Sequence, residues 1–295
     1  MNTFKGKTVV ITGGTDGIGA ATALQLCRLG ADVIAFGRSP SKAERVVEAA
    51  KGMAGTIRVL TEDFSLLRDV ETAAYALGER IKKIDVLVHC VGIILARTEY
   101  TQEGLEKDFA VSYLSRFVFN EILYKEGHLR EDTKLLNIAA SSPKVPKYAQ
   151  MEFDDLEKVK SRTGMKGHGQ AQLANDIYAA MAADRYGLVA IGYGPGSVDT
   201  SIRREIPKWI RVVMKPFFKT RKAQEVAHQL VAILADQSHK PPATYFYNKN
   251  GKFEPSAFIT NRKRQQELLT VSQKLIDNII ESTDLRTQTS DAKYS

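Results

Sequence analysis

Two polar residues spaced for proton transfer lie in the segment Gly167–Asn175, which reads GHGQAQLAN. His168 and Gln172 are four residues apart, so a helix places them on one face. An imidazole titrates near pH ~6.5 and can exchange a proton near neutrality without a neighbouring charge. The Gln172 amide, one turn away, can donate and accept hydrogen bonds. The pair therefore suits general acid–base chemistry, but a lone histidine is usually structural, and both interpretations stay open.

A glycine-rich segment near the N-terminus has the spacing of a phosphate-binding turn. Residues Thr12–Gly19 read TGGTDGIG and continue directly from the apolar run Thr8–Thr12. Glycines allow a tight turn and a close approach of the backbone to a pyrophosphate, and the following helix offers free N–H groups. We expect a dinucleotide to contact Thr12, Gly13, Thr15, Asp16, Gly17, Ile18 and Gly19.

The charge after the second predicted strand favours NADP(H) over NAD(H). Arg38 and Ser39 stand where an NAD site carries an acidic residue for the ribose hydroxyls. The Arg38 guanidinium can pair with a 2′-phosphate, and Ser39 and Lys42 add donors. Asp16 opposes this preference, because it puts a negative charge on the adjoining loop. On balance we expect NADP(H) as the cofactor.

The elements that must position these residues alternate between short apolar strands and amphipathic helices. Strands are predicted at Thr8–Thr12, Asp32–Gly37, Thr56–Leu60, Asp85–His89, Lys134–Ala140, Val189–Tyr193 and Thr244–Tyr247. Helices are predicted at Ala20–Leu29, Lys42–Lys51, Leu67–Lys82, Gly104–Tyr124 and Gln170–Tyr186. This alternation predicts an α/β fold with a doubly wound parallel sheet (Rossmann) in three layers. Ligands should bind at the carboxyl ends of the strands.

Two segments interrupt the alternation. A polar insertion covers Pro143–Lys166, and residues 201–220 hold large apolar side chains such as Trp209 and Phe217. We expect the second segment to be a substrate lid, although its interspersed lysines leave a membrane-interface segment as an alternative. The predicted organisation is a single domain over residues 1–283, with the lid at about 201–220 and a C-terminal helix, followed by a flexible tail over 284–295.

Composition excludes several classes of protein. The chain has 295 residues, a formal net charge of +8 and two cysteines, Cys27 and Cys90, which are too few for a disulfide framework or a zinc quartet. No run approaches the ~18 apolar residues that would span a membrane, and no signal segment is recognisable. The basic residues are scattered, so no nucleic-acid partner and no metal are expected. These features predict a cytoplasmic protein with a small-molecule substrate.

The segment Thr12–Gly19 resembles the nucleotide-binding motif of the short-chain dehydrogenase/reductase superfamily, and the resemblance extends to about Leu275. The run FAVSYLSRFVF is similar to the retinol-dehydrogenase branch. The resemblance implies adenine contact by Asp63 and cofactor contact by Gly92, whereas His89, Cys90 and Val91 depart from the family pattern. It also implies nicotinamide contacts from the segment that reads PGSVDT, namely Pro195, Gly196, Val198 and Thr200.

The catalytic residues that the resemblance implies are largely replaced. The family uses a Tyr and a Lys four residues apart, and the Leu-Ala-Asn run puts His168 and Gln172 at those positions. Ser112 stands at the position of the family's Asn. Ala140 stands at the position of its Ser, unless a shift of one residue brings Ser141 there.

No other tyrosine restores the pair, because Ala182 follows Tyr178 and Glu152 follows Tyr148 at the spacing of the lysine. We therefore expect an atypical NADP(H)-dependent oxidoreductase of an apolar or polycyclic small molecule. The alternatives are a redox-neutral cyclase or dehydratase and a non-catalytic NADP-binding regulatory protein. A homodimer is an expectation from the resemblance alone.

Overall fold

The computed structural model describes residues 3–143, 149, 151–153, 155–156, 164–199 and 220–291, with the backbone alone at 164–165 and 280–291. Within these residues one sheet of eight strands has the order β3-β2-β1-β4-β5-β6-β7-β8. The strands are β1 Thr8–Thr12, β2 Asp32–Phe36, β3 Thr56–Leu60, β4 Val86–His89, β5 Lys134–Ile138, β6 Val189–Gly194, β7 Ala243–Asn248 and β8 Gly251–Phe253. All neighbours are parallel except β7 and β8. The predicted doubly wound sheet is confirmed.

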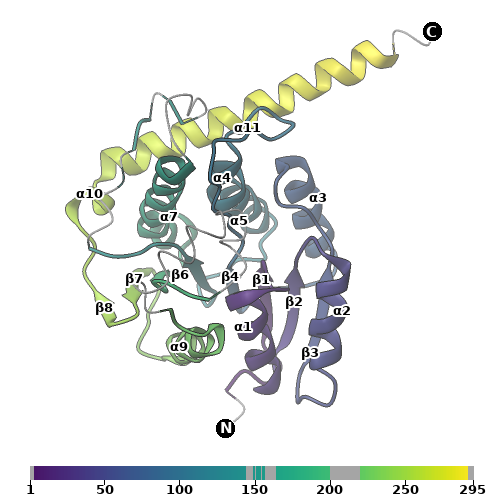
Figure 1. Cartoon of the computed structure of the whole chain (residues 1–295), viewed down its shortest axis with the longest axis vertical. Helices are drawn as coiled ribbons and strands as arrows, with labels where there is room; N and C mark the ends of the chain where they lie inside the picture. Colours follow the sequence, from purple (N-terminus) through teal and green to yellow (C-terminus); the bar gives the residue numbers. More distant parts are fainter. Residues whose placement is uncertain are drawn as a thin grey trace.

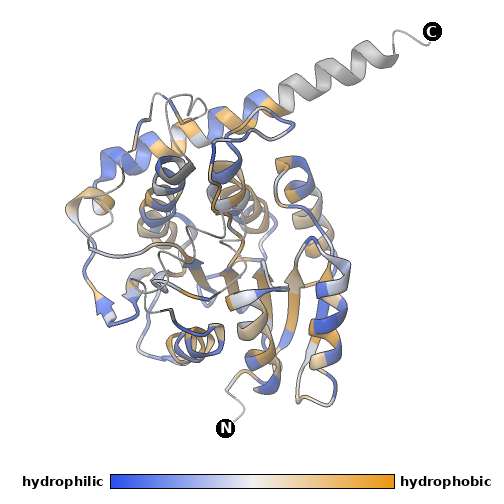
Figure 2. Cartoon of the chain, in the orientation of Figure 1, coloured by the Kyte–Doolittle hydropathy of each residue, from blue (hydrophilic) through white to orange (hydrophobic). Residues whose placement is uncertain are grey.

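Helices cover both faces of this sheet, which gives the three layers (Figure 1). On one face lie α1 Gly17–Arg28, α2 Pro40–Ala49 and α9 Ala223–Ala235, and on the other α3 Leu67–Gly78, α5 Ser115–Lys125 and α7 Gly164–Tyr186. The strands are mostly hydrophobic, whereas α2 at the periphery is mostly hydrophilic (Figure 2). Burial of strands on both faces explains their continuous apolar runs, as in β1, where Val9, Val10 and Ile11 have no exposed surface.

The register of the central strands brings their carboxyl ends together. Thr12 at the end of β1 pairs with Phe36 on β2 and with His89 on β4. The strand order reverses between β1 and β4, so the turns after these two strands diverge and leave a crevice. The glycine-rich turn and the segment Cys90–Gly92 are placed at this crevice by the strand order alone.

The predicted helix Gly104–Tyr124 is divided in three. A short helix α4, Lys107–Phe109, is followed by the π-helical turn η1, Ala110–Leu114, and then by α5. The start is later than predicted because Gly104 has φ +82° and the Glu106 carboxylate caps α4 by accepting from the Phe109 N–H at 2.6 Å. Single π turns within helices often occur at functional sites.

Buried hydrogen bonds tie the turn after β1 to the helical layer behind the sheet. The Thr12 hydroxyl contacts His89 Nδ1 at 3.0 Å, and His89 Nε2 contacts Asn120 Oδ1 at 2.8 Å. Asn120 in turn donates to the hydroxyl of Tyr178, which contacts that of Tyr186. Burial lowers the pKa of His89 to about 3, so its ring stays neutral. Tyr178 is therefore a core residue, in agreement with its exclusion as a catalytic tyrosine.

Some boundaries differ from the predictions. β5 ends at Ile138 instead of Ala140, and the short antiparallel β8 was not predicted. The C-terminal helix α11, Arg262–Asp291, follows the four-residue α10, Ala257–Thr260, and includes most of the segment predicted as a tail over 284–295. It contains no Gly or Pro that would end a helix earlier. The predicted lid, apart from Thr220, and much of the insertion Pro143–Lys166 lie outside the described residues. No helix of the described part could cross a membrane.

Candidate active site

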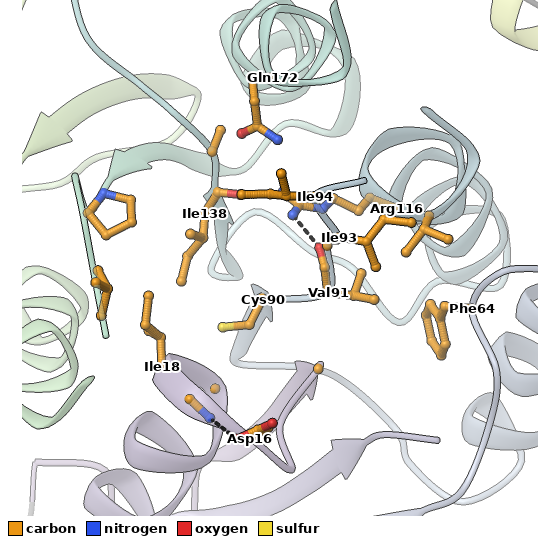
Figure 3. A pocket seen from close by; sticks show the side chains of 18 of the residues that line it. Asp16, Ile18, Phe64, Cys90, Val91, Ile93, Ile94, Arg116, Ile138 and Gln172 are labelled. Atoms are coloured by element: carbon orange, nitrogen blue, oxygen red, sulfur yellow. Dashed lines mark hydrogen bonds between the residues drawn. The ribbon is translucent and has the colours of Figure 1, made fainter. Parts of the chain in front are cut away.

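A cavity of about 1030 Å³ opens at the carboxyl edge of the sheet, around the crevice between β1 and β4. Apolar side chains from several elements surround it, and the Gln172 amide extends into it from α7 (Figure 3). The predicted cofactor residues on its wall are Gly13, Thr15, Asp16, Gly17, Ile18, Gly19, Arg38, Ser39, Asp63, Gly92, Pro195, Gly196 and Val198. Thr12 does not line the cavity, because its side chain is buried against His89. Thr200 lies outside the described residues.

The glycine-rich turn has the geometry of a pyrophosphate cradle. A Cβ at Gly13, where φ is +68°, would lie 2.7 Å from the backbone nitrogen of Val91. A Cβ at Gly19 would lie 2.1 Å from the carbonyl oxygen of Gly13. Asp16 begins α1 as its N-cap and accepts from the Gly17 N–H at 2.8 Å. The turn therefore leaves no room for side chains at these glycines and presents a helix N-terminus to the cavity, which fits a dinucleotide.

The charges at the other end of the crevice are arranged around Asp16. Lys42, on α2, forms an ion pair with the Asp16 carboxylate. Arg38 is exposed and lines the cavity beside Ser39. Asp63, at the same end, accepts from the backbone N–H of Ser65 at 3.0 Å. Lys42 balances the charge of Asp16, and Arg38 adds a positive charge on the same cavity wall, so these residues fit the phosphate of a dinucleotide.

The segment that follows β6 is fixed on the opposite side of the cavity. Val198 forms a β-bridge with Arg221, and the Asp199 N–H donates to the Arg221 carbonyl at 3.0 Å. The Arg221 guanidinium donates to the hydroxyl of Tyr193 at 3.2 Å and to Gln229 Oε1 at 3.0 Å. Pro195–Val198 is thus held against α9 where the family resemblance places the nicotinamide. Arg221 was not among the predicted site residues, because nothing in its local sequence signals this contact.

His168 and Gln172 both lie on the cavity wall, as their helix phase predicts. Leu173 and Ile177 on the same helix have no exposed surface and pack against the sheet side. The His168 side chain is 17 % exposed, and its Nδ1 lies 2.9 Å from Asp108 Oδ2. Both residues therefore border the cavity, while a role in proton transfer stays a prediction.

Asp108 is a site residue that the sequence interpretation missed. Its carboxylate is fully buried and also accepts from the Ser112 hydroxyl, with 2.6 Å between Ser112 Oγ and Asp108 Oδ1. Ser112 Oγ accepts from the Ile93 N–H at 3.2 Å. The spacing of Asp108 and Ser112, one helical turn apart, could have signalled a shared face, but their partner on α7 is 60 residues away in the chain.

The structure places Ser141 and Ala140 differently relative to the cavity. Ala140 is exposed on its wall. Ser141 also borders the cavity, but only 1 % of it is exposed and its hydroxyl donates to the Asp176 carboxylate. Burial raises the pKa of Asp176 to about 7. A catalytic hydroxyl at Ser141 would have to leave this carboxylate to reach a substrate.

Arg116 is a further residue of the site that was not predicted. Its buried guanidinium donates to the carbonyls of Ile138 at 2.8 Å and of Val91 at 2.6 Å, so it links the ends of β5 and β4 (Figure 3). Burial lowers its pKa to about 10, while the charges of Asp108 and Asp176 oppose that shift. Arg116 therefore brings a positive charge to the cavity floor. The described residues hold no group of three His, Cys, Asp or Glu side chains that could bind a metal.

Comparison with known proteins agrees with this architecture. Residues 7–151 match the family model described as short chain dehydrogenase. Human retinol dehydrogenase 14 is 30% identical over 231 residues, covering 72% of this chain and 67% of that protein. Human polyprenol dehydrogenase is 25% identical over 282 residues, covering 90% and 84% of the two chains.

Solved structures show the same fold. A short-chain dehydrogenase/reductase from Serratia marcescens has a TM-score of 0.65 at 20% identity, with 83% of this chain and 97% of that chain covered. An uncharacterised protein from Mycobacterium paratuberculosis has a TM-score of 0.69 at 23% identity, with 92% and 94% covered. The chain belongs to the short-chain dehydrogenase/reductase superfamily of oxidoreductases that bind a nicotinamide cofactor, in the branch similar to the retinol dehydrogenases.

Proposed function

We propose that the protein is an NADP(H)-dependent oxidoreductase of an apolar small molecule, in which His168 replaces the family's tyrosine as the proton-transfer group. The observation that carries the proposal is that one cavity joins the glycine-rich turn, Arg38, the segment Pro195–Val198 and His168. Its volume of about 1030 Å³ leaves space for a substrate beside a dinucleotide.

The substrate class follows from the wall of the cavity between the glycine turn and α7. Apolar side chains dominate there, namely Val91, Ile93, Ile94, Leu95, Val111 and Ile138. The names of the similar retinol and polyprenol dehydrogenases denote apolar alcohols, which supports the same class here. Apolar walls contribute affinity through burial of the substrate, and a few polar groups fix its orientation.

When NADPH is bound it supplies a hydride to the substrate. Arg38 and Lys42 would hold the adenosine phosphate end, and Pro195–Val198 would orient the nicotinamide end. Gln172, one turn from His168, would hydrogen-bond the ribose in place of the family's lysine. Protonated His168 would deliver its proton to the carbonyl oxygen; together with the hydride that NADPH would supply, this gives an alcohol and neutral His168. In alcohol oxidation the same ring accepts the hydroxyl proton.

The experiment compares wild type with His168→Phe in NADPH consumption at 340 nm. Substrates would be a polyene aldehyde, a polycyclic ketone and a cyclic iminium ion. His228→Phe is the matched control, because His228 is an exposed histidine on α9 that does not line the cavity. We expect wild type to reduce at least one carbonyl compound, and His168→Phe to lose ~10²–10⁴-fold in rate, the usual contribution of a general acid.

The iminium ion separates proton delivery from hydride transfer, because its reduction needs no proton at the reacting atom. His168→Phe should therefore slow its reduction less than ~10-fold. NADPH affinity should change little in either variant. Failure to bind NADPH would contradict the proposal, as would carbonyl reduction that survives His168→Phe. Conversion of substrate without consumption of NADPH would instead indicate a redox-neutral reaction.

A further inference from the structure

We propose that Asp108, oriented by Ser112, is a positioning residue that fixes the tautomer of His168 and leaves Nε2 as the nitrogen that faces the substrate. The kinetic part of this inference rests on the proposed function. The tautomer itself is a property of the protein without substrate, so the two can fail separately.

The two oxygens of the Asp108 carboxylate contact different partners. Oδ2 lies 2.9 Å from His168 Nδ1, and Oδ1 accepts from Ser112 Oγ at 2.6 Å. The Ile93 N–H donates to Ser112 Oγ, so the hydroxyl hydrogen of Ser112 is directed to Asp108. Asp108 has no exposed surface, so water does not compete for these oxygens.

The nature of the carboxylate decides which ring nitrogen of His168 carries hydrogen. An ionised carboxylate only accepts hydrogen bonds, so Nδ1 must be the protonated nitrogen of the neutral ring. His168 lines the cavity, and Nε2 is the nitrogen left for a substrate. Neutral His168 then accepts a proton at Nε2 during alcohol oxidation. Protonated His168 donates the Nε2 hydrogen to the oxygen during carbonyl reduction, and solvent restores it.

Other charged groups near the pair come from the same layer of helices. Glu106, immediately before α4, is buried and caps that helix through the Phe109 N–H. Burial raises its pKa to about 7. Arg116 lies close enough to Asp108 for their charges to interact. Neither group forms a hydrogen bond with His168, so the direct hydrogen bond to its ring comes from Asp108.

Ser112 determines how the side-chain amide of an Asp108→Asn variant is oriented. The Ser112 hydroxyl needs an acceptor and therefore holds the amide oxygen on its own side. The amide NH₂ is then turned to His168 Nδ1 and donates to it, which forces the hydrogen onto Nε2. In that tautomer Nε2 cannot accept a proton. In the Ser-His-Asp triad the corresponding change of Asp to Asn leaves the histidine in the wrong tautomer. It lowers turnover ~10⁴-fold.

The direct test is the ¹⁵N spectrum of the histidine rings in the full chain, recorded above the pH at which His168 titrates, with His168→Phe used for assignment. We expect wild type to show hydrogen on Nδ1 and a bare Nε2, and Asp108→Asn to show the reverse. Hydrogen on Nε2 in wild type would overturn the inference whether or not the protein reduces any substrate. This wild-type measurement does not depend on the folding of a variant.

Kinetic variants test the same point through the proposed reaction. Asp108→Asn should lower alcohol oxidation by ~10²–10⁴-fold with little change in NADP⁺ affinity. Adding Ser112→Ala to Asp108→Asn frees the amide to rotate, so the double variant should be faster than Asp108→Asn alone and regain part of the Nδ1–H tautomer. Ser112→Ala alone should cost less than Asp108→Asn. If Ser112 and Asp108 were only structural, the two substitutions would add their defects, and the double variant would be no faster than Asp108→Asn. That result would contradict the orienting role of Ser112.

Discussion

Replacement of Arg38 tests how the protein distinguishes NADPH from NADH. The exposed Arg38 guanidinium lines the cavity near the ion pair of Lys42 and Asp16. A hydrogen bond between charged groups contributes ~1.5–3 kcal/mol. Screening at an exposed site reduces this to roughly 1–2 kcal/mol, so Arg38→Ala should weaken NADPH binding about 5–30-fold. NADH has no 2′-phosphate and should bind the variant nearly as well as wild type.

The neighbouring ion pair provides a second change of opposite sign. Asp16→Asn keeps a side-chain oxygen for the N-cap of α1 but removes the negative charge near the phosphate. It should strengthen NADPH binding, whereas Lys42→Ala, which removes a positive charge beside Asp16, should weaken it. Arg45→Ala is the matched control, because Arg45 is an exposed cation on α2, the helix of Lys42, and does not line the cavity.

Fluorescence titration of wild type and of each variant with NADPH and with NADH gives the dissociation constants that are needed. The preference for NADPH should also decrease with added salt, because the Debye length falls from ~8 Å at 0.15 M to ~3 Å at 1 M. Equal affinities of wild type for the two cofactors would refute the reasoning. An Arg38→Ala variant that loses NADPH and NADH to the same extent would show that Arg38 supports the fold of the site and does not read the phosphate.

Three further variants test the buried polar groups by urea unfolding. Tyr178→Phe removes the acceptor for Asn120 and should lower the free energy of unfolding by ~1–3 kcal/mol without loss of activity. A variant that is stable but inactive would contradict the assignment of Tyr178 to the core. The pKa of Asp176 is raised to about 7 from 3.8, so its protonated form is favoured by folding and wild-type stability should fall as pH rises from about 4 to 7. Asp176→Asn should remove this fall, which is on the order of 4 kcal/mol, and an unchanged pH dependence would contradict this. The pKa of His89 is lowered to about 3 from 6.5, so stability should be lost as pH falls below 6.5, and His89→Gln should reduce that loss; an equal loss in the variant would locate it elsewhere.

The sequence was sufficient for the features that depend on local pattern. The glycine turn was predictable because Gly13 and Gly19 have backbone requirements that few other residues meet. The position of His168 followed from helix phase, since burial of Leu173 and Ile177 fixes the cavity-facing side of α7. The parallel, doubly wound sheet followed from the continuous apolar character of its strands and the helices between them.

Other features required three-dimensional contacts between distant segments. Asp108 and Arg116 look like ordinary charged residues in a helical pattern, and only tertiary packing shows that they are buried beside His168 and the ends of two strands. The Lys42–Asp16 ion pair likewise joins residues 26 apart in the chain. The lid, the contact of Thr200, the homodimer and the cytosolic location stay predictions.

The most direct measurement of the central claim is a crystal structure of the protein soaked with NADPH. We expect ordered density for the whole cofactor, with the 2′-phosphate beside Arg38 and the nicotinamide against Pro195–Val198. The nicotinamide C4 should face a gap in which a substrate carbon fits at ~3–4 Å, with His168 Nε2 on the other side of that gap. A nicotinamide that is disordered in solvent, or a His168 ring turned so that Nε2 contacts protein instead of this gap, would contradict the account.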